Sequence, residues 1–172
     1  IRKFDLSKSD KNKFFFIHNF SPRAPYFFEK NCSRNPEFSF SKIDNKVKDG
    51  YKKNYLCAFK KIELILEYLK NNDPDAIIII QSDHGWSNDL DEILSDEDKI
   101  IYRAKIFNAV KAPEKCFTNF GLPKSNINSI RFALNCALGY NFKKVEDFHF
   151  ISFDEKNENY GKVINKTELI RY

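Results

Sequence analysis

Apolar and polar positions along this chain predict strands and helices in turn. Residues 76–80 read AIIII, a β-branched run that lies between Asn-Asn-Asp-Pro and polar residues. Such a run is typical of a strand buried on both faces of a sheet. Residues 13–20, KFFFIHNF, form a second apolar run that ends at a Ser-Pro pair, and we expect a buried strand over residues 14–17. The polar residues 27–50 are expected to form a long surface loop.

A helix is predicted over residues 51–71, because its apolar positions recur at spacings of one, three and four. The stripe consists of Tyr55, Leu56, Phe59, Ile62, Leu66 and Leu69. Asp49 suits the N-cap, and Asn-Asn-Asp-Pro ends the helix. Strand, helix and strand in this order predict a βαβ unit whose two strands are parallel. The residues that follow the two strands would then emerge on the same edge of the sheet.

The second half of the chain adds weaker patterns. Residues 100–110, IIYRAKIFNAV, partly alternate and predict an exposed or edge strand. Residues 148–153 and 160–165 predict an antiparallel hairpin with a long turn. The expected fold class is therefore α/β, with a partly parallel sheet flanked by helices and a C-terminal antiparallel hairpin, in a single domain over residues 1–172.

A short helix is predicted over residues 125–138. Ser125 or Asn126 would be its N-cap, and Gly139 stands at the position where a left-handed residue commonly ends a helix. Its apolar face consists of Ile127, Ile130, Leu134 and Leu138.

Composition is that of a globular domain, with 172 residues of which 42% are hydrophobic and 31% are charged. The net charge of +5 comes from lysines spread along the chain, so we expect no nucleic-acid partner. The longest apolar runs are far shorter than the roughly 20 residues of a membrane helix. The four cysteines lack C-x-x-C spacing. Cys57 and Cys136 fall in helical patterns where we expect buried free thiols, with disulfides as the alternative.

Asp83 and His84 follow the isoleucine strand directly and carry the candidate chemistry. A carboxylate oxygen and an imidazole nitrogen are usual ligands of Zn²⁺ or Mn²⁺. Gly85 would let the backbone turn sharply, so that the two side chains can converge. The alternative is an Asp-capped turn with a surface histidine.

Four segments in order together resemble the sulfatase-like branch of the alkaline phosphatase superfamily. IIQSDHG resembles its strand that ends in the metal motif Ser-Asp-His-Gly, and FFFIHNFSPRAPYFF resembles its strand followed by His-x-x-x-Pro-His-x-Pro-Tyr. RAKIFNAVKAP resembles its Leu-Asn-Ala-x-x-x-Pro segment. SNINSIRFALNCALGY resembles its Ser-Pro-Val-Asn-x-x-Arg-x-x-x-Asn helix.

The resemblance implies an alkaline-phosphatase-like fold and a hydrolase or transferase of phosphate or sulfate esters, such as those of a sugar or lipid. Asp83 and His84 would be metal ligands, for Zn²⁺ or Mn²⁺ rather than Ca²⁺ or Mg²⁺. The ion would polarise the ester and activate a hydroxyl nucleophile. His18 matches the family's first histidine, a substrate or leaving-group contact, with a packed strand histidine as the alternative. Arg23 stands at a histidine position, where it could hold the anion in a bidentate manner.

The chain also departs from the family. Trp86 replaces a common glutamate, and only seventeen residues precede His18, whereas the family's nucleophile and another metal-binding acid lie well before that histidine. We therefore expect the C-terminal part of a sulfatase-like domain, with half of a metal site. The rival hypothesis is a catalytically inactive sulfatase-like module for binding or scaffolding. By the same resemblance the location would be extracytoplasmic (periplasmic or cell envelope), with membrane attachment only through other segments.

Overall fold

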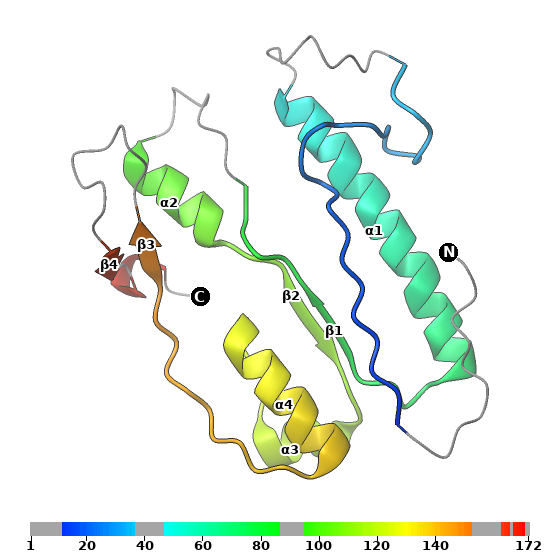
Figure 1. The fold of residues 1–172 in the computed structure, drawn as a ribbon, viewed down its shortest axis with the longest axis vertical. Helices are drawn as coiled ribbons and strands as arrows, with labels where there is room; N and C mark the ends of the chain where they lie inside the picture. The colour runs from blue at the N-terminus through cyan, green and yellow to red at the C-terminus, as the bar shows by residue number, and fades with distance from the viewer. Residues whose placement is uncertain (1–11, 37–46, 87–94, 153–162, 166, 171–172) are drawn as a thin grey trace. The chain divides into compact units, whose positions relative to one another are not determined.

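A computed structural model describes residues 12–36, 47–86, 95–152, 163–165 and 167–170 of the chain. The architecture is mixed α and β (Figure 1). The chain divides into two compact units, residues 1–74 and 75–172, and each is described by itself. In chain order the elements are α1 (Val47–Asn72), β1 (Ile78–Gln81), α2 (Asp96–Ala104), β2 (Asn108–Lys111), α3 (Glu114–Phe120), α4 (Asn126–Leu138), β3 (Phe150–Ser152), β4 (Val163–Asn165) and the 3-10 helix η1 (Thr167–Leu169).

The first unit is built on α1, which confirms the predicted helix. The helix begins at Val47, so Asp49 lies in its first turn and is not the N-cap. Cys57 is fully buried and Ala58 nearly so. Asn54 is also buried, and its Nδ2 donates to the carbonyl of Phe28 at 3.1 Å. This amide ties the preceding loop to the helix.

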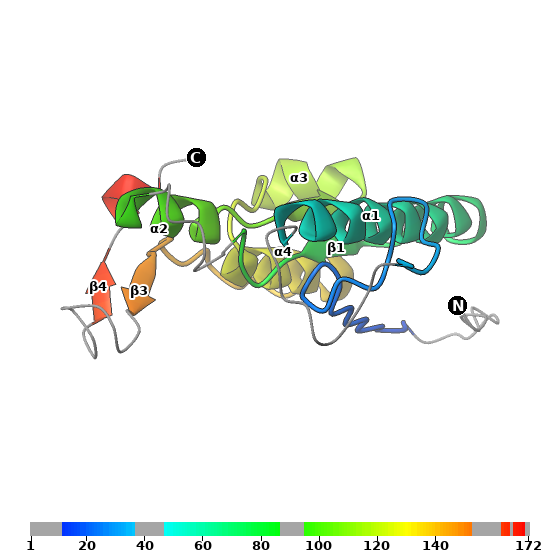
Figure 2. The same ribbon diagram turned by 90° about the horizontal axis from the view of Figure 1, so that it is seen from above.

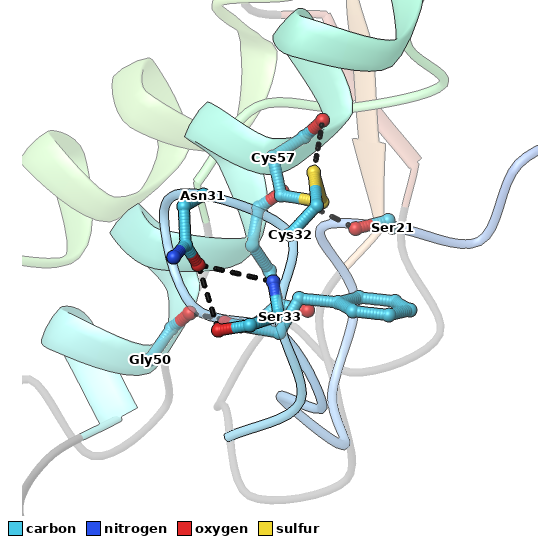
Figure 3. The surroundings of a disulfide bond; sticks show 8 residues. Ser21, Asn31, Cys32, Ser33, Gly50 and Cys57 are labelled. Atoms are coloured by element: carbon cyan, nitrogen blue, oxygen red, sulfur yellow. Dashed lines mark hydrogen bonds between the residues drawn. A yellow bond between two sulfur atoms is a disulfide. The ribbon is translucent and has the colours of Figure 1, made fainter.

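A disulfide joins Cys32 of that loop to Cys57 of α1, so the expectation of a free thiol at Cys57 is wrong (Figure 3). The two cysteines are 25 residues apart in sequence. Beside the bond, Asn31 Oδ1 accepts hydrogen bonds from the backbone N–H and the hydroxyl of Ser33, at 3.0 and 2.7 Å. Cys57 is both fully buried and disulfide-bonded. Its sequence pattern alone did not distinguish a buried disulfide from a buried free thiol.

The strand expected at residues 14–17 is not formed. Residues 12–20 have no assigned strand, and Phe14 and Phe16 are 84% and 80% exposed. The aromatic and β-branched composition favours an extended backbone, but a strand also needs a neighbour to share its hydrogen bonds. In the described part of the chain these residues make no ladder, so the prediction of a buried strand is wrong for this structure.

In the second unit, β1 confirms a strand at the isoleucines, but its residues are half-buried rather than buried on both faces. It pairs with β2 in an antiparallel ladder. Ile79 faces Val110 and Gln81 faces Asn108. Both ladders in the described residues are antiparallel, β1 with β2 and β3 with β4. The predicted parallel pairing is therefore not part of the described structure, whereas the C-terminal hairpin is. Figure 2 shows the β3 and β4 arrows side by side.

The expected strand over residues 100–110 is wrong in its first half, which belongs to α2. Ser95 is the N-cap of α2, and its Oγ accepts from the backbone N–H of Asp98 at 3.1 Å. The Ser95 hydroxyl also donates to Asp98 Oδ2 at 2.7 Å. A Ser followed three residues later by an acidic residue is a helix-start signal, and here it outweighs the partial alternation that follows.

Helices α3 and α4 pack side by side and are joined by a disulfide between Cys116 and Cys136 (Figure 1). The expected free thiol at Cys136 is therefore also wrong. Ser125 is the N-cap of α4, and Gly139 ends it in the left-handed region at φ 70°, both as predicted. No helix of the described residues is long and apolar enough to cross a membrane.

The face of α4 that is buried is not the apolar stripe. Ile127, Ile130 and Leu138 are 47 to 51% exposed. The opposite face is buried and carries Asn128, Ser129, Phe132 and Asn135. Polar groups inside a protein need hydrogen-bond partners, and the asparagines find them in the backbone of the segment that follows the helix. Asn135 exchanges two hydrogen bonds with the backbone of Phe142, at 2.8 and 2.9 Å.

Candidate functional site

The carboxyl end of β1 is fixed by Ser82. Its backbone N–H donates to the carbonyl of Phe107 at 2.9 Å, and its Oγ accepts from the Phe107 N–H at 2.8 Å. The hydroxyl thus takes the place of a ladder carbonyl just beyond the last paired residue of β1. These two bonds fix the backbone at Ser82, the residue before Asp83.

Asp83 and His84 form a compact pair at that end. The backbone N–H of His84 donates to Asp83 Oδ1 at 3.1 Å, and His84 Nε2 lies 3.7 Å from Asp83 Oδ2. His84 Nδ1 lies 2.8 Å from the carbonyl oxygen of Gly85. Because a carbonyl only accepts, this contact places a ring hydrogen on Nδ1, and Nε2 is the nitrogen that faces the carboxylate. The side chains of Asp83 and His84 are 88% and 43% exposed.

Gly85 is needed for space. A Cβ at this position would lie inside van der Waals contact of the carbonyl oxygens of Tyr102 and Lys105, at the end of α2. The Gly85 N–H donates to the carbonyl of Arg103 at 2.6 Å. Its φ is not in the left-handed region, so the expected role in a sharp turn is replaced by close packing of two backbones.

Asn126 supports the same strand end from the start of α4. Its Nδ2 donates to the carbonyl of Ser82 at 3.0 Å. Its Oδ1 is buried and has no hydrogen-bond partner among the described residues. Exchange of the amide oxygen and nitrogen would place two acceptors against each other, so the carbonyl of Ser82 fixes this orientation. A buried acceptor of this kind calls for a donor such as water or a ligand N–H or O–H.

Asn108 of β2 adds further side-chain hydrogen bonds near the end of β1, and with Asn126, Gln81 and Ser129 it forms a polar layer. Its Oδ1 accepts from Gln81 Nε2 at 3.0 Å and from the hydroxyl of Ser129 at 3.2 Å. Sequence reasoning found Asp83 and His84 but missed Asn108 and Ser129, and it treated Asn126 only as a possible helix cap. Asparagine, glutamine and serine residues occur in all of these segments of the sequence. Which of them form hydrogen bonds with each other depends on the register of β1 and β2 and on the placement of α4.

A divalent ion fits the Asp83–His84 pair in part. Zinc lies about 2.0–2.2 Å from imidazole nitrogen and carboxylate oxygen, and the 3.7 Å between Nε2 and Oδ2 allows one ion to reach both atoms. A ligand histidine also commonly donates its other N–H to a backbone carbonyl, as His84 does to Gly85. Two ligands are fewer than the three or four of a usual site. Among the described residues, no group of three or more His, Cys, Asp or Glu side chains could hold a metal.

His18 and Arg23 lie in the first unit and flank one turn. The backbone N–H of Arg23 donates to the carbonyl of Phe20 at 2.8 Å. The His18 ring centroid is 4.6 Å from that of Phe20 and 6.4 Å from that of Phe16. Both His18 and Arg23 are exposed, so His18 contacts neighbouring rings without being a buried strand residue.

Comparisons with protein-family models, with curated proteins and with solved structures found no match to this chain. The resemblance to sulfatase-like proteins therefore rests on the four sequence segments alone. The geometry described above bears on what Asp83 and His84 can bind, and it is independent of that resemblance.

Proposed function

We propose that this chain carries part of the metal site of a sulfatase-like, metal-dependent hydrolase or transferase that acts on phosphate or sulfate esters of a sugar or lipid. The observation that carries the proposal is the Asp83–His84 pair, with Nε2 and Oδ2 3.7 Å apart and Nδ1 directed to a backbone carbonyl. This arrangement leaves one nitrogen and one carboxylate oxygen for a single ion. The alternative is a capped turn with a surface histidine, since Asp83 Oδ1 also accepts the His84 N–H at 3.1 Å and both side chains are exposed.

Zn²⁺ or Mn²⁺ is the ion expected from a mixed nitrogen and oxygen ligand pair. When bound, it would polarise the ester oxygen and lower the pKa of the attacking hydroxyl. The resemblance assigns the nucleophile and at least one further acidic ligand to a segment that precedes His18 in the family. The 172-residue chain alone should consequently bind metal weakly or not at all.

The test is calorimetric titration of Zn²⁺ and Mn²⁺ into this chain and into the full-length gene product, together with an esterase assay. We expect tight binding in the full-length protein that Asp83→Ala or His84→Ala abolishes, with activity lost in parallel. Asp75→Ala and His149→Ala are matched controls that remove the same groups elsewhere in the second unit, and both should bind like the parent. An active full-length protein that tolerates both site changes would refute the assignment.

His18 and Arg23 would contact the anionic ester on this proposal. Arginine presents a planar fork that suits two oxygens of a phosphate or sulfate group. Arg23→Ala should therefore raise KM more than Arg23→Lys does, because lysine keeps the charge but loses the fork. If Arg23→Lys kept the KM of the parent, Arg23 would act only as a nonspecific positive charge.

A catalytically inactive sulfatase-like module is the second candidate. Arg23 at a histidine position and Trp86 at a glutamate position favour it, because both changes remove groups that could bind metal or move a proton. This candidate predicts a folded full-length protein without esterase activity and without tight Zn²⁺ or Mn²⁺ binding. The titration above separates the two.

An extracytoplasmic location is part of the proposal, and two disulfides support it. Cys32–Cys57 lies in the first unit and Cys116–Cys136 in the second. Stable disulfides belong mainly to oxidising compartments such as the periplasm or the cell exterior. Thiol labelling of the protein from cells, before and after reduction, would test it: four accessible thiols without reductant would contradict this location.

A further inference from the structure

A small cavity lies between α3, α4 and the segment after α4, on residues that the proposed site does not use. Its volume is about 180 Å³, well below the 300 to 1,000 Å³ of pockets for drug-sized ligands. Five of its lining residues carry nitrogen donors: Asn119, Asn128, Arg131, Asn135 and Lys144. The amides of Asn128 and Asn135 already donate to the carbonyls of Val145 and Phe142. None of the described residues that line it is acidic. The wall thus carries two positive charges, from Arg131 and Lys144, and the carboxylate of Asp147, which does not line it, accepts from the lining residue Asn128 at 2.9 Å.

Most of these donors remain available. Arg131 spends one N–H of Nη1 on the carbonyl of Ile127 at 3.1 Å, and Lys144 Nζ donates to the carbonyl of Leu122 at 3.3 Å. Guanidinium and ammonium groups have further N–H donors after these bonds are made. Both backbone contacts also hold the cationic side chains near the wall, which lowers the entropy lost when a ligand binds.

The walls are held in place from several sides. The Cys116–Cys136 disulfide joins α3 to α4, and the rings of Phe117 and Phe132 lie 5.1 Å apart between the same helices. Asn135 is bonded in both directions to the backbone of Phe142. The segment that brings Lys144 is therefore attached to α4, and the cavity is formed before any ligand arrives.

We propose that this cavity binds a small oxyanion, a carboxylate, sulfate or phosphate group, between Arg131 and Lys144. Charge-assisted hydrogen bonds from a guanidinium and an ammonium are the strong contacts that such a group makes. The rings of Phe120, Phe132 and Phe142 also line the cavity, and they offer an apolar surface to whatever carries the anion. The proposal does not depend on the ester-cleaving function, because Asp83 and His84 do not line the cavity.

The experiment is titration of the full 172-residue chain with sodium sulfate, sodium phosphate and sodium benzoate, each against sodium chloride at equal ionic strength. Binding can be followed by calorimetry or by NMR shifts. We expect saturable binding of at least one oxyanion. Arg131→Gln and Lys144→Gln should each weaken it about tenfold or more, because each removes charge-assisted hydrogen bonds. A preference for benzoate would indicate that the natural ligand carries a carboxylate on a planar group. A preference for sulfate or phosphate would indicate a tetrahedral anion.

Lys143→Gln is the matched control, since it removes the same charge at the neighbouring position. The Lys143 side chain is exposed and does not line the cavity. Its affinity should stay within about twofold of the parent, a difference well under 1 kcal/mol. Should Arg131→Gln fail to fold, the exposed Lys144 decides the question alone. Absence of saturable binding to all three anions would overturn the proposal. Equal weakening by Lys143→Gln and Lys144→Gln would also overturn it, because it would show attraction to net charge only.

Discussion

Gly85→Ala is the substitution that most directly tests how the fold positions the candidate metal ligands. The added methyl group would collide with the carbonyl oxygens of Tyr102 and Lys105, which are backbone atoms at the end of α2 and cannot rotate away. The loop must move off the helix, and the hydrogen bond from the Gly85 N–H to the Arg103 carbonyl must lengthen or break. Since His84 Nδ1 contacts the carbonyl of Gly85, the imidazole would move with it.

The magnitude follows from two contributions. Overpacking costs about 1 to 3 kcal/mol, and loss of one backbone hydrogen bond adds about 0.5 to 1.5 kcal/mol. We therefore expect the free energy of unfolding to fall by about 2 to 4 kcal/mol. With a urea slope of about 2 kcal/mol/M, the midpoint should fall by about 1 to 2 M. Trp86 is the single tryptophan of the chain, so its fluorescence reports unfolding next to the substituted residue.

Gly139 provides the control, because it needs glycine for the opposite reason. It has φ 70°, and a Cβ there would meet nothing within 4 Å. Ala at position 139 should cost about 1 to 2 kcal/mol through backbone strain, and Asn, which tolerates that region, should cost less. At position 85 Asn should be worse than Ala, because it is larger. An unchanged midpoint for Gly85→Ala, or recovery by Asn, would refute the steric account.

Two further substitutions test the interior of each unit. Asn128→Asp should lower the free energy of unfolding by about 2 to 4 kcal/mol, because the new oxygen would face the carbonyl of Val145 and the carboxylate of Asp147, to which the amide now donates at 2.9 Å. Urea unfolding followed by Trp86 fluorescence should show it, and a neutral outcome would mean that Asn128 is not held by these acceptors. Replacing both Cys32 and Cys57 by Ser should cost about 2 to 4 kcal/mol, measured as the loss of helical circular dichroism with urea. In reductant the parent and the variant should unfold at the same midpoint, because both then lack the Cys32–Cys57 bond and both have reduced Cys116 and Cys136; a difference that persists in reductant would contradict the assignment of the cost to the disulfide.

Helix α1, helix α4 and strand β1 could be predicted from sequence, because each carries a local signal that tertiary context did not override. For α4, Ser125 and Gly139 mark both ends, and both take the expected cap positions. The end of β1 could be predicted as well, since the polar residues after Ile80 have no place in a buried run. Asp83 and His84 therefore lie where the pattern placed them, at the carboxyl end of the strand.

The wrong predictions for residues 14–17 and for the cysteines share one cause. The pattern of residues along the chain does not show which distant residue each one contacts. Residues 14–17 have the composition of a strand but no ladder in the described structure. The cysteines have the environment of packed thiols, yet Cys57 meets Cys32 and Cys136 meets Cys116. For the cysteines, the partner lies 25 residues away in one pair and 20 residues away in the other. Such distances are beyond the reach of local periodicity.

The asparagines of α4 show why the polar layer beneath the candidate site escaped sequence reasoning. A helix with isoleucine and leucine on one face is expected to bury that face, but here the buried positions include Asn128 and Asn135. An asparagine amide has a donor and an acceptor, so it can form both of the hydrogen bonds that a neighbouring strand would make with the backbone of an irregular segment. Asn135 does so for the N–H and the carbonyl of Phe142. At the start of the same helix, Asn126 holds the carbonyl of Ser82. The position of Asp83 thus depends on amide contacts made by a helix that, judged by its apolar stripe, should have faced the other way.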